Sequence, residues 1–86
     1  MSDETILMLG SIVVAGVTMA LGAIGAALGE SRIGAAGLDA LARQPDESGP
    51  ITRNQFVALA MVESTAIFCL VIALVLLFAN PFVSGR

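Results

Sequence analysis

The chain has 86 residues, of which 57% are hydrophobic and 13% charged, and it contains no His, Trp or Tyr. Its mean hydropathy of +0.94 is higher than a water-soluble domain of this size can accommodate by burial. The net charge of −3 gives no reason to expect a nucleic-acid partner. The composition therefore predicts an all-α membrane protein, with lipid around most of the chain.

Two apolar stretches predict two transmembrane helices. The first, Ile6 to Gly29, contains no charged residue, and the second, Asn54 to Asn80, contains only Glu63. Each exceeds the roughly 20 residues that a helix needs to cross the hydrocarbon core. A signal peptide is the alternative for the first stretch, but its N-terminal flank is acidic and the stretch is too long, so we expect it to stay in the mature protein.

A polar segment between the two stretches predicts a turn, because it holds two prolines, a glycine and three charges. We therefore expect a single antiparallel hairpin domain with the first helix over 5–42, a loop over 43–50 and the second helix over 51–80. Pro81 cannot continue the second helix.

The basic residues predict the orientation in the membrane. Three of the four arginines, Arg32, Arg43 and Arg53, lie in or beside the loop. Because basic loops stay on the cytoplasmic side, we expect a cytoplasmic loop and both termini on the outer side.

Small residues recur along the first helix at intervals of three or four, which places them on one face. In a bilayer such a face lets helix backbones approach closely, and Gly25 and Gly29 add a GxxxG pattern. The alternative is that Gly and Ala are merely common in membrane helices. The residues expected to pack are Gly16, Ala20, Ala23, Gly25, Ala27, Gly29, Gly34 and Gly37.

Glu63 is the main candidate functional residue. It lies roughly 13 Å along the second helix from Asn54, at 1.5 Å per residue. A carboxyl group at this depth costs roughly 2.5 kcal/mol or more on insertion scales, and such groups mark ion-binding or ion-relay sites. The alternative is a polar contact that only holds two helices together.

Glu30 is expected to face Glu63, because the two glutamates lie equally far from the centre of the loop, between Asp46 and Glu47. Two negative charges in a low dielectric repel strongly, so either one carboxyl holds a proton or a cation lies between them. The pair should titrate as a unit. The alternative is that Glu30 reaches the cytoplasmic surface and is solvated there with Arg32.

Further oxygen atoms lie near Glu63 in the sequence. Ser64 and Thr65 supply hydroxyl groups, and the backbone carbonyl of Met61 is another candidate ligand. Carboxylate, hydroxyl and carbonyl oxygens are the ligands of hard cations. Serine and threonine in membrane helices also bond to their own backbone, so the informative pattern is this run facing a second carboxyl group.

The chain resembles the c subunit of F-type ATP synthases, which forms their rotor ring, over nearly its whole length. The Arg-Gln-Pro loop, 20 residues before a membrane glutamate, is the specific part of the pattern. The segments that carry the resemblance are Ala42-Arg43-Gln44-Pro45, Glu63-Ser64-Thr65, Ile72-Ala73-Leu74 and Ala79-Asn80-Pro81-Phe82.

The resemblance implies a c-ring of identical hairpins in a bacterial inner membrane, turning against the a subunit of the stator. It implies no catalytic residue and no cofactor beyond a bound Na⁺ or H⁺. Glu63 matches the ion carrier, and Ser64 and Thr65 match the hydroxyl ligand and the residue that holds a water. In sodium-binding members the first-helix ligand is usually glutamine, and Glu30 stands at the matching position. The residues that match the loop touching the central-stalk subunits gamma and epsilon are Arg43, Gln44 and Pro45.

Two departures bear on the ion and on the ring. Several sodium-binding members have a tyrosine that hydrogen-bonds the carboxylate, and Phe68 stands there in this chain. Many members have glycines where this chain has Ala23 and Ala27, and the added methyl groups should push neighbouring helices apart and enlarge the ring. With the paired glutamates, these alanines look similar to the N-type branch of the family.

Two functions are compatible with these sequence features. A rotor protein that carries an ion on Glu63 explains the hairpin, the membrane glutamate and the basic loop together; sodium, bound by Glu63, Glu30 and Ser64, is favoured over protons. A small membrane scaffold or pore-forming hairpin needs the small-residue face but no Glu63 in mid-membrane. An enzyme acting alone is not expected, because no nucleophile–base pair or phosphate-binding loop is present.

Overall fold

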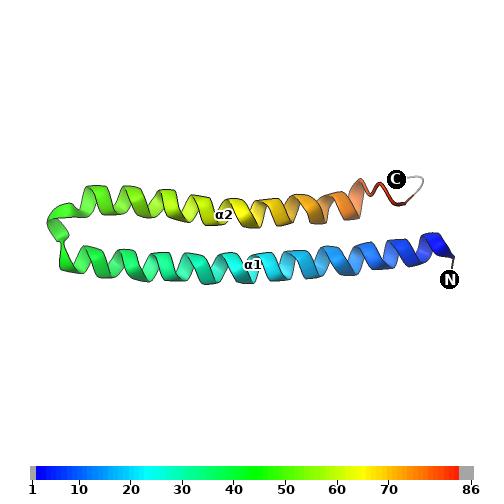
Figure 1. The fold of residues 1–86 in the computed structure, drawn as a ribbon, viewed down its shortest axis with the longest axis horizontal. Helices are drawn as coiled ribbons and strands as arrows, with labels where there is room; N and C mark the ends of the chain where they lie inside the picture. Colours follow the sequence, from blue (N-terminus) through cyan, green and yellow to red (C-terminus); the bar gives the residue numbers. More distant parts are fainter. Residues whose placement is uncertain (1, 84–86) are drawn as a thin grey trace.

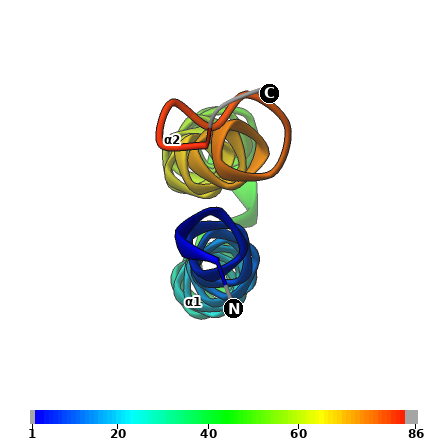
Figure 2. The ribbon, with the colours of Figure 1, turned by 90° about the vertical axis from the view of Figure 1, so that its right-hand side faces the viewer.

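The computed structural model describes residues 2–83, which form one antiparallel pair of long helices (Figure 1). Helix α1 spans Asp3–Arg43, a short 3-10 helix η1 spans Pro45–Glu47, and helix α2 spans Ser48–Phe78. The two long helices lie side by side in both views (Figures 1 and 2), and the hairpin measures 64 × 16 × 9 Å. The expected two-helix hairpin is confirmed.

The ends of α1 follow ordinary capping rules. The Ser2 hydroxyl accepts a hydrogen bond from the Thr5 backbone N–H at 3.2 Å, and Asp3 and Glu4 occupy the first turn, where negative charge complements the helix dipole. At the other end, the backbone N–H of Gln44 donates to the Ala40 carbonyl at 2.9 Å.

The connection between the helices is shorter than the expected loop over 43–50. Only Gln44 and η1 separate the two helices, and Gly49 and Pro50 already lie in the first turn of α2. Proline is compatible with a first helical turn, because the N–H that it lacks has no partner within the helix there. At its other end α2 stops at Phe78, two residues earlier than expected.

The interface between the helices is built from small side chains. The buried residues of the two helices are Ala15, Ala26 and Ala73. A Cβ atom at Gly22 would lie 2.8 Å from the Cβ and Sγ atoms of Cys69. Such close approach of two backbones is typical of helix packing in membranes.

The register of the hairpin follows from residues that meet across the interface. Gly22 lies against Cys69, Gly29 against Val62, and Gly37 against Gln55. Each pair is centred within one residue of Pro45. Residues at equal distance from the connection therefore lie at nearly the same level, as the sequence predicted for the two glutamates.

The small-residue face of α1 is only partly used inside the hairpin. A Cβ atom at Gly16, Gly25 or Gly34 would meet nothing within 4 Å, whereas Gly29 and Gly37 lie against α2. Ala20, Ala23 and Ala27 are exposed. Most of the face is therefore free to pack against something other than α2.

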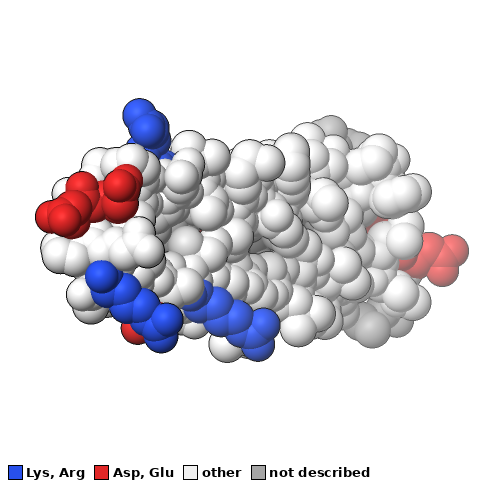
Figure 3. Space-filling model, turned by 60° about the vertical axis from the view of Figure 1, so that its left-hand side comes forward, with Lys and Arg blue, Asp and Glu red and all other residues white. Residues whose placement is uncertain are grey.

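The surface of the hairpin is apolar along most of its length. Large side chains such as Leu21, Phe56 and Phe78 are 66%, 67% and 72% exposed. Both helices are long and apolar enough to cross a membrane. On the face shown in Figure 3, charged side chains gather at the connection end, with an uncharged zone behind them. This distribution fits a hairpin whose middle lies in lipid.

Candidate ion-binding site

The carboxyl groups of Glu30 in α1 and Glu63 in α2 are neighbours in the structure. Their side chains lie close enough for one carboxyl group to hydrogen-bond to the other. Such a bond requires a proton on one of them, because an ionised carboxylate only accepts hydrogen bonds. The pairing expected from the loop symmetry is therefore present within a single hairpin.

The two glutamates open to the side of the hairpin and not into its core. Glu63 is exposed and Glu30 is half-exposed. In a membrane, lipid or a neighbouring protein chain would cover this side. A pair that is neutral overall, through a bound proton or a cation, tolerates such surroundings far better than two free charges.

Ser64 and Met61 form a second group of oxygen atoms on α2. The Ser64 hydroxyl donates a hydrogen bond to the Met61 carbonyl oxygen at 2.6 Å. The Ser64 oxygen keeps its lone pairs for a cation, whereas the Met61 carbonyl would exchange this bond for one to the ion. The bond also directs the Ser64 side chain toward Met61.

The two groups of oxygen atoms lie on different sides of the same hairpin. At roughly 100° per residue, Met61 and Glu63 lie roughly 160° apart around α2. Glu63 points toward Glu30 on one flank of the hairpin, while Met61, which is 68% exposed, lies on the other. Met61 therefore lies on the side of α2 away from the Glu30–Glu63 pair, and Ser64, roughly 100° from Glu63 around the helix, bonds toward Met61.

Thr65 and Phe68 lie on the side of α2 that carries Met61. Thr65 is exposed, and its position two residues after Glu63 turns it away from the glutamate pair. Phe68 follows Met61 by seven residues and shares its side of α2, where it is 68% exposed. The Phe68 side chain has no hydroxyl group that could hydrogen-bond a carboxylate or bind an ion.

Within residues 2–83, no three His, Cys, Asp or Glu side chains gather into a cluster that could hold a metal ion. The Glu30–Glu63 pair is the acidic group within the apolar part of the hairpin. Supplemented by hydroxyl and carbonyl oxygens, it offers the ligands of a hard monovalent or divalent cation and none of the soft ligands of transition metals.

Comparison with known proteins assigns the chain to a family. The family model described as the ATP synthase C subunit matches residues 13–76. The chain belongs to the ATP synthase c-subunit family. The ATP synthase c 2 subunit of Cereibacter sphaeroides is 52% identical over 82 residues, which cover 95% of this chain and 98% of the relative.

Other relatives in this family are similar over most of their length. The ATP synthase c subunit of Petrotoga mobilis is 51% identical over 73 residues, covering 85% of this chain and 76% of that protein. The ATP synthase c subunit of Prochlorococcus marinus strain AS9601 is 43% identical over 79 residues, covering 92% and 98%. The two-helix architecture with two candidate membrane spans agrees with a membrane protein of the c-subunit family.

The residues where α1 passes into the connection are exposed. Arg43, Gln44 and Pro45 are all exposed. The Arg43 Nε atom lies 3.2 Å from the Asp39 Oδ2 atom one helical turn earlier, in an exposed ion pair. Arg43 is 20 residues from Glu63 in sequence, so this surface is separate from the glutamate pair.

The sequence predicts Glu63, Glu30 and Ser64 as ligands of one ion, and this set stays a prediction; the structure places Glu30 beside Glu63. The angular separation of Met61 and Glu63 is itself readable from the sequence, since two residues along a helix correspond to more than half a turn. What could not be read from the sequence was the direction in which Glu63 faces relative to α1, and hence which ligands one hairpin leaves apart.

Proposed function

We propose that this chain forms the rotor ring of a bacterial ATP synthase and that it carries the coupling ion on Glu63. The observation that supports this most directly is the direct pairing of Glu30 with Glu63 at the side of a hairpin from the c-subunit family. The chain supplies no catalytic group for ATP chemistry. ATP is handled by other subunits, and this chain moves an ion.

A closed ring follows from the two different flanks of the hairpin. One flank carries Glu30 and Glu63, and the other carries Met61 with the Ser64 hydroxyl bonded to it. Two different surfaces that bind head to tail produce heterologous contacts, which form a ring when the rotation between successive copies closes. In such a ring, Ser64 and Met61 of one copy meet the glutamate pair of the next, so the complete site lies between two copies.

Sodium is the ion that the ligand set favours. One Na⁺ and one ionised carboxylate form a neutral unit, which is required while the site faces lipid. Glu63 is the charged ligand, Ser64 and the Met61 carbonyl are neutral ligands, and Thr65 holds a water. Glu30 takes part in protonated form, accepting the ion on its carbonyl oxygen and donating its proton to Glu63.

Protons are the alternative coupling ion, and one observation favours them. Phe68 gives no hydroxyl group that could fix the Glu63 carboxylate toward a cation, and a proton-binding site needs only a carboxyl group. The additional oxygen atoms have no role in that case, which is why we favour sodium.

The surroundings of the ring follow from the charges. The end of the hairpin with the connection, where Arg43 and Arg53 lie on either side of it, is in the cytoplasm, and both termini lie on the outer side of the inner membrane. Arg43, Gln44 and Pro45 contact the central-stalk subunits gamma and epsilon. The glutamate pair meets the a subunit of the stator, while membrane lipid covers the rest of the outer surface.

Carbodiimide labelling of the purified ring tests the ion, because the reagent modifies protonated carboxyl groups. At fixed pH, we expect sodium to slow modification of Glu63 and potassium at equal ionic strength to have no such effect. A Glu63→Gln ring is the control for labelling at other carboxyl groups. Modification that is indifferent to sodium would favour protons.

The same Glu63→Gln variant separates a rotor protein from a scaffold. An assembled ring that no longer supports coupled ATP synthesis is expected for the rotor. Unchanged ATP synthesis in membranes that contain only the variant would exclude it.

A further inference from the structure

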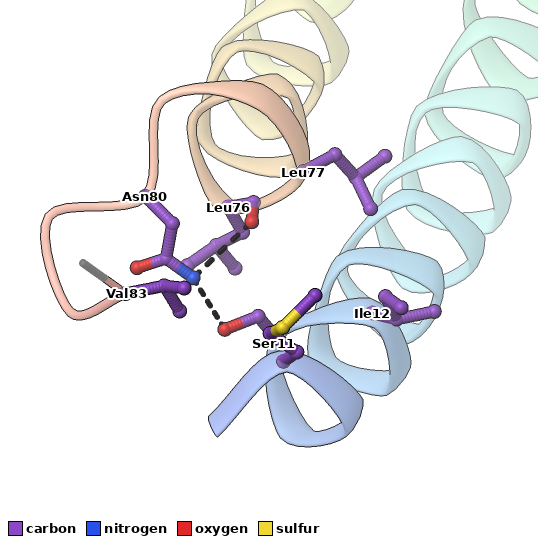
Figure 4. A pocket seen from close by; sticks show the side chains of 7 residues that line it. Ser11, Ile12, Leu76, Leu77, Asn80 and Val83 are labelled. Carbon is purple, nitrogen blue, oxygen red and sulfur yellow. Dashed lines mark hydrogen bonds between the residues drawn. The ribbon is translucent and has the colours of Figure 1, made fainter. Parts of the chain in front are cut away.

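Asn80 is a buried polar side chain at the end of the hairpin opposite the connection, with only 3% of its surface exposed. Its amide nitrogen donates to the Ser11 hydroxyl of α1 and to the Leu76 carbonyl oxygen, the latter at 3.2 Å (Figure 4). Its amide oxygen accepts from the Phe82 backbone N–H at 2.9 Å. Both amide protons and the oxygen are therefore used, as a buried amide requires.

The backbone after α2 turns back because of Asn80 and Pro81. The Val83 N–H donates to the Asn80 carbonyl at 3.4 Å, which closes a four-residue turn with Pro81 at its second position. Proline fixes the backbone angle favoured there, and the Asn80 side-chain bond to Phe82 is the matching Asx turn.

The turn carries Val83 back to the interface between the helices. Val83 is 6% exposed and lines a small cavity with Met8 and Ile12 of α1 and Leu76 of α2. Figure 4 shows Asn80 reaching from the turn toward Ser11, with Val83 beside it. The segment after α2 thus covers the end of the hairpin.

The Asn80–Ser11 bond differs from the other serine side-chain bonds among residues 2–83, which all join residues three positions apart, those of Ser2 included. Ser31 donates to Leu28 and Ser64 donates to Met61, each within its own helix, whereas Asn80 joins residues 69 positions apart. Contacts between small apolar side chains have little directionality. A directional hydrogen bond at the open end can therefore fix the axial position of one helix against the other, as the connection does at the closed end.

We propose that Asn80 is a latch, which holds the open end of the hairpin closed through Ser11 and prevents α2 from sliding along α1. The latch is independent of which ion the chain carries, and of whether it carries one.

Hydrogen exchange of the detergent-extracted protein, in whatever assembly it forms, tests the latch. We expect Ser11→Ala to speed exchange of the amides of Phe82 and Val83 and of residues 8–14 about fivefold, the effect of losing one net hydrogen bond. Ser11→Thr keeps the hydroxyl and should retain protection. Ser31→Ala is the matched control, since it removes a serine bond that stays within α1.

A double-mutant cycle identifies the partner of Asn80. Asn80→Ala should accelerate exchange more than Ser11→Ala, because it also removes the bonds to Leu76 and Phe82. The double variant should match Asn80→Ala alone, since the bond between the two side chains is already lost. The proposal would be overturned if the exchange rate of the double variant were raised by the product of the two single effects. It would also be overturned if Ser11→Ala exchanged no faster than Ser31→Ala. This second comparison does not require an Asn80 variant that folds.

Discussion

At the scale of single residues, the two neighbouring glutamates differ in surroundings. Glu63 is exposed at the flank, whereas Glu30 is half-covered by the hairpin. An ion carrier that meets a stator must be reachable from outside, which suits Glu63. A neutral ligand can stay in place beside it, which suits Glu30. Under the proposed function, this difference in exposure suits Glu63 to the charged role and Glu30 to the neutral one, although both are glutamates.

This division predicts different outcomes for two Glu30 variants. Glu30→Gln keeps a carbonyl oxygen and a hydrogen-bond donor, so the sodium concentration that half-protects Glu63 from carbodiimide should change less than about twofold. Glu30→Ala removes both groups and should raise that concentration about tenfold or more, as is typical for loss of a supporting group at a metal site.

Two results would count against the role of Glu30. Half-protection of the alanine variant at the wild-type sodium concentration would show that Glu30 is not a ligand. Loss of protection in both variants to the same extent would show that the second carboxyl group itself is needed.

The neighbouring positions of Glu30 and Glu63 could be predicted from residues alone. Glu63 stands out because charge is rare in a membrane span, and Glu30 because it lies equally far from the loop. The latch residue Asn80 could not be predicted in this way, because its role depends on the turn at Pro81 and on Ser11, 69 residues away. Short-range patterns carry no information about such a pairing.

At the scale of the helices, the register was predictable and the helix faces were not. The sequence placed the centre of the hairpin between Asp46 and Glu47, and the observed contacts are centred within one residue of Pro45. This small shift arises because Gly49 and Pro50 join α2 and shorten the connection. The face of α1 that meets α2 was harder to predict, because small residues occur on more than one side of this helix.

Gly22 provides a test of the interface between the helices. A methyl group there would lie 2.8 Å from both Cys69 Cβ and Sγ, and a Cβ atom cannot move away without its backbone. We expect Gly22→Ala to destabilise the hairpin by about 1–3 kcal/mol, the usual cost of overpacking. Denaturant-dependent circular dichroism of the detergent-solubilised protein measures the change.

Gly10→Ala is the matched control, because a Cβ atom at Gly10 meets nothing within 4 Å. Alanine is also the better helix former by about 1 kcal/mol, so this variant should be as stable as the wild type or more so. Equal stability of the two variants would contradict the close approach of the helices at Gly22.

At the scale of the whole molecule, the surfaces left open by the hairpin predict the assembly. Most of the small-residue face of α1 meets nothing within the hairpin, and the candidate ligands lie on two flanks. A ring of many copies uses both features, whereas a two-fold dimer pairs each flank with itself and leaves Ser64 away from the glutamates.

Native mass spectrometry of the detergent-extracted assembly measures its copy number. We expect a single closed ring, and a larger one than that of a variant in which Ala23 and Ala27 are both glycine, because methyl groups at a crowded inner interface hold neighbouring helices further apart. A dimer as the main species would rule out the ring. If the double-glycine variant forms a ring of the same copy number, the methyl groups of Ala23 and Ala27 do not determine the size of the ring.

Arg43, at the end of α1 beside the connection, should couple rotation to ATP chemistry and take no part in ion binding. By the register of the hairpin, Arg43 lies level with the start of α2, 15 residues before Glu63, which is roughly 22 Å along the helix at 1.5 Å per residue. The Arg43 and Asp39 side chains of the ion pair are 75% and 62% exposed, and exposed pairs contribute little to stability. Arg43→Ala should therefore leave the ring assembled and the carbodiimide labelling of Glu63 at its wild-type rate, while ATP hydrolysis no longer drives ion pumping in membrane vesicles.

Arg53→Ala is the control, since Arg53 is an exposed arginine on the other helix near the same end. If Arg43→Ala loses both the labelling of Glu63 and ion pumping in an assembled ring, Arg43 acts on the ion site. If Arg43→Ala and Arg53→Ala lose pumping equally, the positive charge at this end of the hairpin matters and the position of Arg43 does not.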